Sequence, residues 1–218
     1  MRGGAMAKEK VEYTYDENTQ RWLENANIGK RKQHGQYMTP NEVGTQLVGK
    51  LGVFPQGAKV LDPAVGTGEL LKAVQKKYPG VETFGWELDP EILQYGMKSL
   101  PDTTFINQDA LLVSKNPVHD IVIGNPPFFE FSPDMTVKEM YADVIKGRVN
   151  IYGLFFKVGL DALKPGGKIA YIVPPSMNTG AYFEKLRSYI LQHATIESLE
   201  IVVEQNMFDQ AQVVIQLI

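Results

Sequence analysis

The sequence predicts an α/β domain built on a doubly wound, mostly parallel β-sheet. From residue 59 onward, short apolar runs alternate with helical segments of about ten residues, and strands separated by helices favour a parallel sheet. The chain has 218 residues, the size of one α/β domain with a substantial core. The last two apolar runs are joined only by residues 204–212, and so short a link favours an antiparallel pair at one end of the sheet.

The expected elements follow one another in a regular order. Residues 16–27 are polar and are predicted to be helical. The helix at 69–78 has an apolar face, and the strongly apolar helix at 151–163 ends at the stop signal KPGG. Two further helices are expected at 90–100 and 181–193, and strands are expected at 59–62, 81–88, 104–107, 120–124, 168–173, 199–203 and 213–218.

Composition excludes several classes of function. The chain has no cysteine, which removes disulfides, thiolate metal sites and a thiol nucleophile, and which fits a reducing compartment. The formal net charge is −3, so no overall positive field attracts nucleic acid. No apolar run approaches the length of a membrane span, and the N-terminus lacks the apolar core of a signal peptide.

The tetrapeptide NPPF at 125–128 ends the apolar run at 121–124 and suits a flat base that carries an amino group. The amide oxygen of Asn125 and the carbonyl of Pro126 can both accept hydrogen bonds from such an amino group, and neither proline has an N–H to compete. Phe128 can stack on the ring. The alternative is a strand end closed by a rigid Pro-Pro turn.

Residues 60–70 read as a strand, a glycine-rich turn and the start of a helix. Gly66 and Gly68 let the backbone approach a ligand closely, and the turn leads into a helix N-terminus. The spacing is not GxGxxG and no Gly-Lys-Ser/Thr follows, which counts against a dinucleotide site or a P-loop. The carboxylate of Asp62 suits a cationic amino group better than a pyrophosphate.

Two further acidic residues lie at or just after the carboxyl ends of predicted strands. Glu87 lies where an acid commonly holds ribose hydroxyls, with a surface acid as the alternative, and Asp109 can accept from an adenine amino group. Ligands of open α/β sheets lie at the carboxyl ends of the strands. We therefore expect Asp62, Glu87, Asp109 and Asn125 to line one rim of the sheet, with Leu88 and Ala110 giving apolar contact.

Two segments remain open to more than one interpretation. In the stretch GQYMTPNE at 35–42, Thr39 is predicted to be a helix N-cap, with Pro40 as the first helical residue and Glu42 as the capping-box partner. The N-terminus of this helix could also hold a carboxylate. The long, mixed segment 129–150 is either a functional lid or a peripheral insertion.

Together these motifs resemble a known family. The series GQYMTP, LDPAVGTGEL, WELDP, INQDAL, GNPPF and KPGGKIAYIVPPS is similar to the catalytic domain of γ-class DNA adenine-N6 methyltransferases of type I and type II restriction–modification systems. The match runs from about Gly35 to the last residue, in the family's order. The resemblance implies the Rossmann-like fold of methyltransferases that depend on S-adenosylmethionine (SAM), a seven-stranded, mostly parallel sheet with one antiparallel strand.

The resemblance also implies a role for each motif in cofactor binding. Glu87 would bind the ribose of SAM, Asp109 would accept from its adenine amino group, and Pro127 would pack on its adenine ring. No metal is implied. The residues expected at the methionine end of the cofactor are Thr39, Asp62, Ala64 and Gly66.

For the target base, the resemblance implies a second set of contacts. Asn125 and Pro126 would hold the amino group of an adenine flipped out of DNA, and Phe128 would stack on that base. Phe208 falls where the family places a second aromatic side chain against the base.

Two departures from the family bear on domains and partners. The catalytic domain is expected at 34–218 after a polar, helical extension at 1–33, and no target-recognition domain follows. Because the net charge is also negative, we expect sequence reading to lie in a following domain or in a specificity or restriction subunit. The chain ends inside the apolar run 213–218, which predicts a fragment of a longer protein. A cytoplasmic protein of a prokaryote or phage is expected, with DNA as partner and no membrane.

Several alternatives are weighed against this hypothesis. Motifs like NPPF also occur in methyltransferases of guanine amino groups in ribosomal RNA and of a glutamine amide in release factors; Asp62-Pro63 and GQYMTP favour DNA. A non-catalytic SAM-binding subunit is disfavoured by the intact Asn125 and Phe128. Cytosine C5 methylation needs a cysteine nucleophile, and a nicotinamide dehydrogenase does not fit the glycine spacing.

Overall fold

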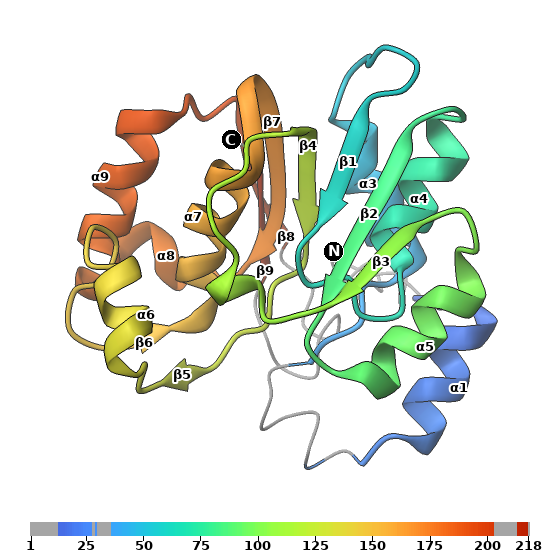
Figure 1. Ribbon diagram of the computed structural model, residues 1–218, viewed down its shortest axis with the longest axis horizontal. Helices are drawn as coiled ribbons and strands as arrows, with labels where there is room; N and C mark the ends of the chain where they lie inside the picture. The colour runs from blue at the N-terminus through green and yellow to red at the C-terminus, as the bar shows by residue number, and fades with distance from the viewer. Residues whose placement is uncertain (1–12, 28, 30–35, 203–212, 218) are drawn as a thin grey trace, which may run out of the picture.

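Five parallel strands form the centre of the molecule (Figure 1). The computed structural model describes residues 13–27, 29, 36–202 and 213–217. The parallel strands lie in the order β3-β2-β1-β4-β7, which confirms the predicted α/β class. Their bounds are β1 Lys59–Asp62, β2 Glu82–Glu87, β3 Thr104–Asn107, β4 His119–Gly124 and β7 Leu163–Val173.

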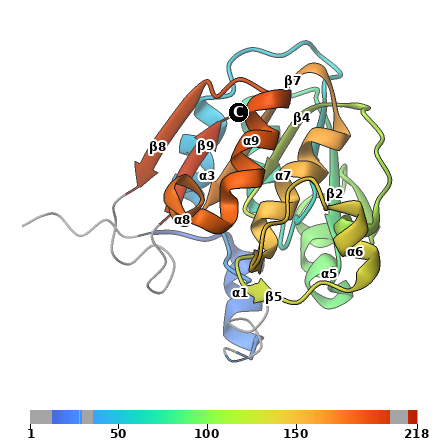
Figure 2. The same ribbon diagram turned by 90° about the vertical axis from the view of Figure 1, so that its left-hand side faces the viewer.

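An antiparallel pair continues the sheet beyond β7. Strand β9 (Val213–Leu217) pairs antiparallel with β7, and β8 (Ser198–Val202) pairs antiparallel with β9, at the edge seen in Figure 2. The short connection predicted this pairing. Residues 203–212 between the two strands lie outside the described residues, and so does Phe208, the predicted second aromatic contact of the target base.

Helices cover both faces of the sheet and bury its alternating side chains. On β4, Ile121 and Ile123 face one core with α3, α4 and α5, while Val122 faces the other core with α7 and α9. This period of two is the pattern of a strand buried on both faces. Figure 2 looks onto the face covered by α7 and α9. The helix bounds are α3 Asn41–Gly49, α4 Glu69–Lys77, α5 Pro90–Ser99, α7 Ile151–Ala162 and α9 Glu184–His193.

The segment 129–150, which could be a lid or an insertion, folds as a small α/β unit. Strands β5 (Glu130–Phe131) and β6 (Val149–Asn150) pair antiparallel around helix α6 (Met135–Met140). Three single-turn helices complete the described elements: η1 Ala110–Leu112, α8 Ser176–Thr179 and η2 Ala181–Phe183.

Helix α1 (Glu17–Asn25) packs against the body of the domain. Asp16 caps the helix by accepting a hydrogen bond from Thr19 N, as its residue type favours. Trp22 is buried in a cluster with Met38 and Ile92. Thr19 Oγ1 donates to Thr67 Oγ1 at 2.7 Å, so the N-terminal helix directly contacts the glycine-rich turn.

Two local predictions are wrong. Helix α3 begins at Asn41, Pro40 occupies the cap position, and no side chain caps the helix. Glu42 instead accepts hydrogen bonds from Thr14 N (3.0 Å) and Thr14 Oγ1 (2.6 Å), a pairing distant in sequence that outcompetes the local capping box. Strand β7 begins at Leu163 rather than at residue 168, because Leu163 already pairs with His119.

None of the helices in the described part of the chain is both long and apolar enough to cross a bilayer.

Candidate functional site

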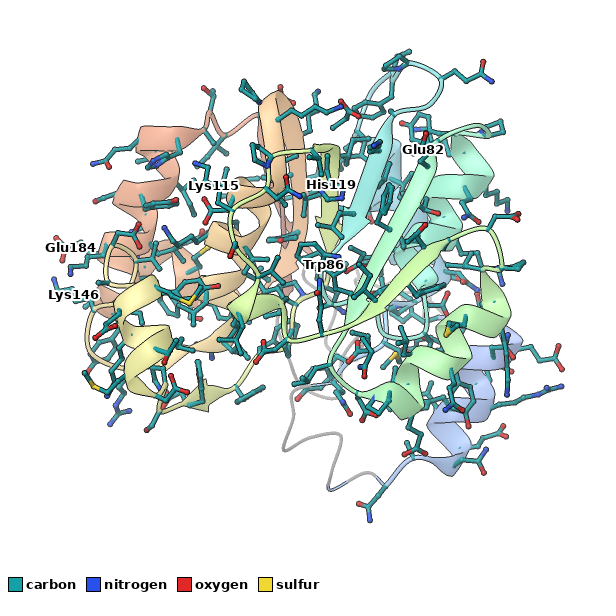
Figure 3. All side chains as sticks on the ribbon, viewed as in Figure 1. Glu82, Trp86, Lys115, His119, Lys146 and Glu184 are labelled. Atoms are coloured by element: carbon teal, nitrogen blue, oxygen red, sulfur yellow. The ribbon has the colours of Figure 1, made fainter. Side chains whose placement is uncertain are left out.

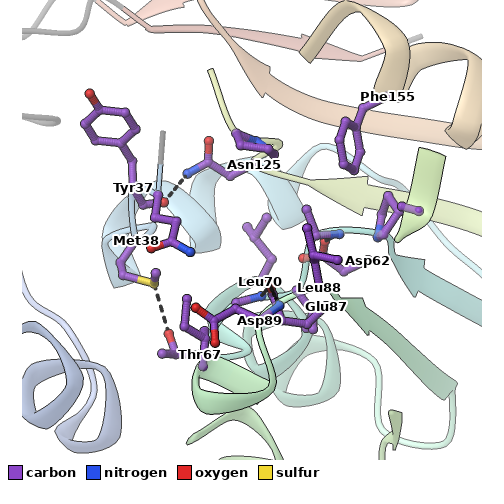
Figure 4. A pocket seen from close by; sticks show the side chains of 18 of the residues that line it. Tyr37, Met38, Asp62, Thr67, Leu70, Glu87, Leu88, Asp89, Asn125 and Phe155 are labelled. Carbon is purple, nitrogen blue, oxygen red and sulfur yellow. Dashed lines mark hydrogen bonds between the residues drawn. The ribbon is translucent and has the colours of Figure 1, made fainter. Parts of the chain in front are cut away.

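A cavity of about 490 Å³ opens at the carboxyl ends of the parallel strands (Figure 4). Strands β2 and β3 lie on one side of β1, and β4 and β7 lie on the other, so the strand order reverses between β1 and β4. Ligands of open α/β sheets bind at this kind of reversal. The walls come from residues 36–39, 62–67, 69–70, 87–90, 92, 108–111, 125, 127, 129, 151 and 155.

The structure brings together most of the predicted site residues. All seven predicted cofactor residues and Asn125 line this one cavity, as do Leu88 and Ala110. Pro126 and Phe128 are not among its lining residues, although they lie within three residues of Asn125 in the sequence. The lining residues predicted from sequence are Thr39, Asp62, Ala64, Gly66, Glu87, Asp109, Pro127 and Asn125.

Asp62 is a buried carboxyl group at the end of β1. It is 2% exposed, and its Oδ1 accepts a hydrogen bond from Ala64 N at 3.0 Å. Burial raises the pKa of Asp62 to about 8, and the negative charge of Glu87 adds to the rise. A cation in the cavity would restore the charged form of such a group.

Asp62→Asn should stabilise the protein at neutral and alkaline pH. Because the pKa of Asp62 is about 8 in the folded state and about 3.9 in an unfolded chain, only the folded state keeps the proton between these values. The free energy of unfolding therefore falls as pH rises through this window, and the substitution should raise it at pH 8 by roughly 2–5 kcal/mol. Denaturant unfolding at several pH values measures the slope.

The exposed Asp102→Asn is the matched control for this substitution and should leave the slope unchanged. Burial also raises the pKa values of Glu69 and Glu87, so part of the slope should persist in Asp62→Asn. A slope identical to that of the parent chain would contradict the account of Asp62.

Glu87 anchors the glycine-rich turn to the end of β2. Its Oε2 accepts from Gly66 N at 3.0 Å and its Oε1 accepts from Asp89 N at 2.9 Å. Burial raises the pKa of Glu87, although both backbone N–H groups oppose the rise. Each carboxylate oxygen keeps a further lone pair that can accept from a ligand hydroxyl.

The turn itself requires glycine. Gly66 has φ +55° and Gly68 has φ +93°, in the left-handed region. A Cβ atom on Gly68 would lie 2.7 Å from Leu100 Cδ1. The two glycines therefore allow both the backbone path and the close packing of α5 against the turn.

Asn125 is held by its nitrogen and leaves its oxygen unpaired. Its Nδ2 donates to Tyr37 O at 2.9 Å and to Thr39 Oγ1 at 3.1 Å. Figure 4 shows the first of these bonds, with the amide between Tyr37 and the end of β4. Its Oδ1 is buried and has no hydrogen-bond partner among the described residues. A buried acceptor without a partner costs about 1–3 kcal/mol, so the site is prepared for a donor on a ligand.

Phe128 belongs to an aromatic cluster beside Asn125. Its ring stacks on Tyr37, with centroids 5.2 Å apart and an interplanar angle of 13°, and it meets Tyr152 edge-on at 6.5 Å. No base can fit between two rings at the first distance. A base that stacks on that face of Phe128 must therefore displace the Tyr37 ring.

Sequence interpretation missed several lining residues. Glu69 is buried, its Oε2 has no partner among the described residues, and burial raises its pKa. Its place directly after the second glycine was the available signal. Ile151 and Phe155 reach the cavity from one face of α7, and their four-residue spacing could have indicated this. Met38 had no sequence signal, because its partner, Thr67, is distant in the chain.

The buried histidine lies away from the site. His119 sits at the amino end of β4 and packs edge-on against Phe84 and Trp86 (Figure 3). Its Nδ1 lies 3.2 Å from Ala162 O, and burial lowers its pKa. Within the described residues, no cluster of three or more histidine, aspartate or glutamate side chains could hold a metal ion.

Comparison with known proteins gives matches over most of the chain. The model of the family described as Eco57I restriction-modification methylase matches residues 73–208, more than half of the chain. The modification methylase CviBIII of Paramecium bursaria Chlorella virus NC1A is 29% identical over 185 residues, which cover 83% of this chain and 48% of that protein.

Type II methyltransferases of bacteria match in the same way. M.TthHB8I of Thermus thermophilus is 28% identical over 175 residues, covering 75% of this chain and 40% of that protein. M.AccI of Acinetobacter calcoaceticus is 25% identical over 192 residues, covering 83% and 35%. The match therefore spans about a third to a half of the length of these relatives.

A solved structure has the same fold. The Listeria monocytogenes protein lmo1582, described as a class I S-adenosylmethionine-dependent methyltransferase, superposes with a TM-score of 0.76. The match covers 92% of this chain and 64% of that chain at 22% sequence identity. The similarity supports the α/β architecture.

Proposed function

Because the chain belongs to the Eco57I restriction-modification methylase family, whose cofactor is SAM, we propose that it transfers a methyl group from SAM to N6 of an adenine flipped out of DNA. The observation that carries this proposal is the amide of Asn125, which is held by its nitrogen and presents an unpaired buried oxygen. That oxygen is an acceptor for an amino group.

The cavity fits the cofactor in size and charge. Its volume of about 490 Å³ lies within the range of small-molecule sites, about 300–1,000 Å³. SAM carries a sulfonium and an ammonium group, and the carboxyl groups of Asp62 and Glu69 are buried where they could meet cations. In our proposal Thr39, Asp62, Ala64 and Gly66 hold the methionine end. Glu87 holds the ribose, and Asp109 and Pro127 hold the adenine.

The chain's own residues would activate the target amino group. The N6 lone pair of adenine is delocalised into the ring, so the amino group is a poor nucleophile. Asn125 Oδ1 and the Pro126 carbonyl would each accept a hydrogen bond from one N–H of this amino group and draw it toward a tetrahedral geometry, which frees the lone pair. Bound SAM supplies an electrophilic methyl group, and alignment of the two groups would give much of the acceleration. Flipping the base costs roughly a few kcal/mol.

Phe128 is proposed as the stacking platform for the flipped base. Phe128→Leu removes the aromatic face while keeping an apolar side chain, and it should weaken productive DNA binding by about 1–3 kcal/mol. The measurement is KM for DNA at saturating SAM. Phe128→Tyr keeps the ring and should behave like the parent chain. If leucine and tyrosine gave the same KM, Phe128 would have no stacking role.

The fold and the relatives support the rest of the proposal. The strand order β3-β2-β1-β4-β7-β9-β8, in which β9 runs opposite to the other six strands, supports a seven-stranded methyltransferase sheet. We propose that a target-recognition domain or a specificity or restriction subunit reads the DNA sequence, because the match covers at most about half of the relatives. A prokaryotic or phage cytoplasm stays the predicted location.

The substrate class can be tested by competition. The chain is incubated with SAM labelled in the methyl group and with unmodified DNA, ribosomal RNA and a protein extract, separately and together. Label in DNA supports the proposal. Label in RNA or protein would support methyl transfer from SAM but would contradict DNA as the substrate. Binding of SAM without transfer would favour a non-catalytic subunit or a need for the partner that reads DNA.

A further inference from the structure

Thr39 lines the cavity in a short segment that contacts two of its walls. On one side, Asn125 Nδ2 donates to Thr39 Oγ1 at 3.1 Å and to Tyr37 O at 2.9 Å. On the other side, Met38 Sδ accepts from Thr67 Oγ1 at 3.3 Å in the glycine-rich turn, a contact drawn in Figure 4. One short segment, residues 37–39, therefore contacts both Asn125 and the turn.

The hydroxyl of Thr39 can make one more hydrogen bond of a defined kind. A threonine hydroxyl donates one proton and can accept two. Here the oxygen accepts from Asn125, and its own proton has no acceptor among the described residues. Thr39 is 4% exposed and lines the cavity. The hydroxyl proton is therefore available for an acceptor on a molecule in the cavity.

We propose that Thr39 is a positioning residue that couples the bound cofactor to the orientation of Asn125. Its hydroxyl donates to the carboxylate of SAM, the one anionic group of that molecule, and accepts from the Asn125 amide. This inference rests on the proposed function, because it deepens the roles of the same site.

The coupling depends on which orientation of the Asn125 side-chain amide lets its groups form their hydrogen bonds. Without a cofactor, the Thr39 hydroxyl can rotate and donate to Asn125. The amide can then flip so that its oxygen points at Thr39 and away from the target amino group. With its proton engaged by a carboxylate, the hydroxyl can only accept from Asn125. Tyr37 O is also an acceptor, so both groups then favour the nitrogen. Oδ1 stays directed at the target amino group.

The test is the exchange of the Asn125 side-chain amide protons with water, measured by NMR on the 15N-labelled chain. The signals are assigned by their absence from Asn125→Ala. S-adenosylhomocysteine, which has the carboxylate but no transferable methyl group, should slow the exchange by about fivefold, the ratio that one net hydrogen bond supports. 5′-Methylthioadenosine, which lacks the amino-acid part, should not slow it.

Variants separate the hydroxyl from the rest of the site. Thr39→Ser keeps the hydroxyl and should keep the slowing by S-adenosylhomocysteine, whereas Thr39→Val should lose it although the ligand still binds by calorimetry. Thr45→Val, at an exposed threonine of α3, is the matched control and should behave like the parent chain. Equal slowing by both ligands in the parent chain, or full slowing in Thr39→Val, would overturn the proposal.

Kinetics give a second readout. At saturating SAM, Thr39→Val should lower the single-turnover rate of transfer by roughly fivefold, the effect of losing the neutral hydrogen bond that orients Asn125. A residue that served the methionine end alone would change only the affinity for SAM. The exchange measurement needs no DNA. It therefore decides whether Thr39 links the cofactor to Asn125 even if the chain methylates no DNA and the proposed function fails.

Discussion

Asn125→Ala should slow methyl transfer by about 10²–10³-fold while SAM still binds. The substitution removes the amide oxygen of Asn125, which directly follows β4, is buried and has no hydrogen-bond partner among the described residues. The contact that would hold the target amino group is lost with it. Loss of one group that stabilises a transition state typically costs about 10²–10³-fold in turnover. Single-turnover transfer from labelled SAM measures the rate, and calorimetry measures the affinity for SAM.

A second asparagine provides the control. Asn25 is exposed at the end of α1 and donates only to Arg21 O of its own helix, so Asn25→Ala should transfer at the parent rate. Normal turnover of Asn125→Ala would contradict the proposal that Asn125 holds the target amino group during transfer. If Asn125→Ala lost both SAM binding and turnover, Asn125 would support the cofactor pocket. Its proposed role as the acceptor for the target amino group would then lack support.

Glu87→Ala should weaken SAM binding by roughly 1.5–3 kcal/mol, as expected for the loss of a charged hydrogen bond. Besides the loss of the proposed contact with the ribose, the structure gives a second reason for weaker SAM binding. Gly66 N and Asp89 N both lose their acceptor in this variant, so only the backbone bond from Val65 N to Trp86 O still joins the glycine-rich turn to the end of β2 among the described contacts. Calorimetric titration with SAM gives the change in affinity directly.

Glu82→Ala is the control on the same strand. Glu82 is exposed at the amino end of β2 (Figure 3), whereas the cavity lies at the carboxyl end, so its loss should leave the affinity for SAM unchanged. If Glu87→Ala bound SAM as tightly as the parent chain, both the ribose contact and the support of the turn would be contradicted.

The sequence predicted the fold and the rim of the site because both follow from local patterns. Alternating apolar residues and short helices identified the strands, and the carboxyl ends of parallel strands must lie on one edge. Asp62, Glu87 and Asn125 each follow or close such a strand, so their convergence on one cavity needed no knowledge of distant contacts.

What the sequence did not predict depends on contacts between distant segments. The pattern at 39–42 satisfies the local capping rule, yet Glu42 pairs with Thr14 and Thr39 pairs with Asn125. The stack of Tyr37 on Phe128 joins residues about ninety positions apart. Helix α1 lies in the stretch predicted to be a polar, helical extension, and the packing of Trp22 and Thr19 against the wall of the cavity was not predicted.

Mass spectrometry of nucleosides shows whether the Asn125 site directs a methyl group to N6 of adenine. Unmodified DNA is incubated with the chain and with SAM that carries a trideuterated methyl group, then digested. We expect N6-(trideuteromethyl)adenine from the parent chain and about 10²–10³-fold slower labelling by Asn125→Ala. A trideuterated methyl group on cytosine, or equal labelling of adenine by both proteins, would contradict this role of the Asn125 site.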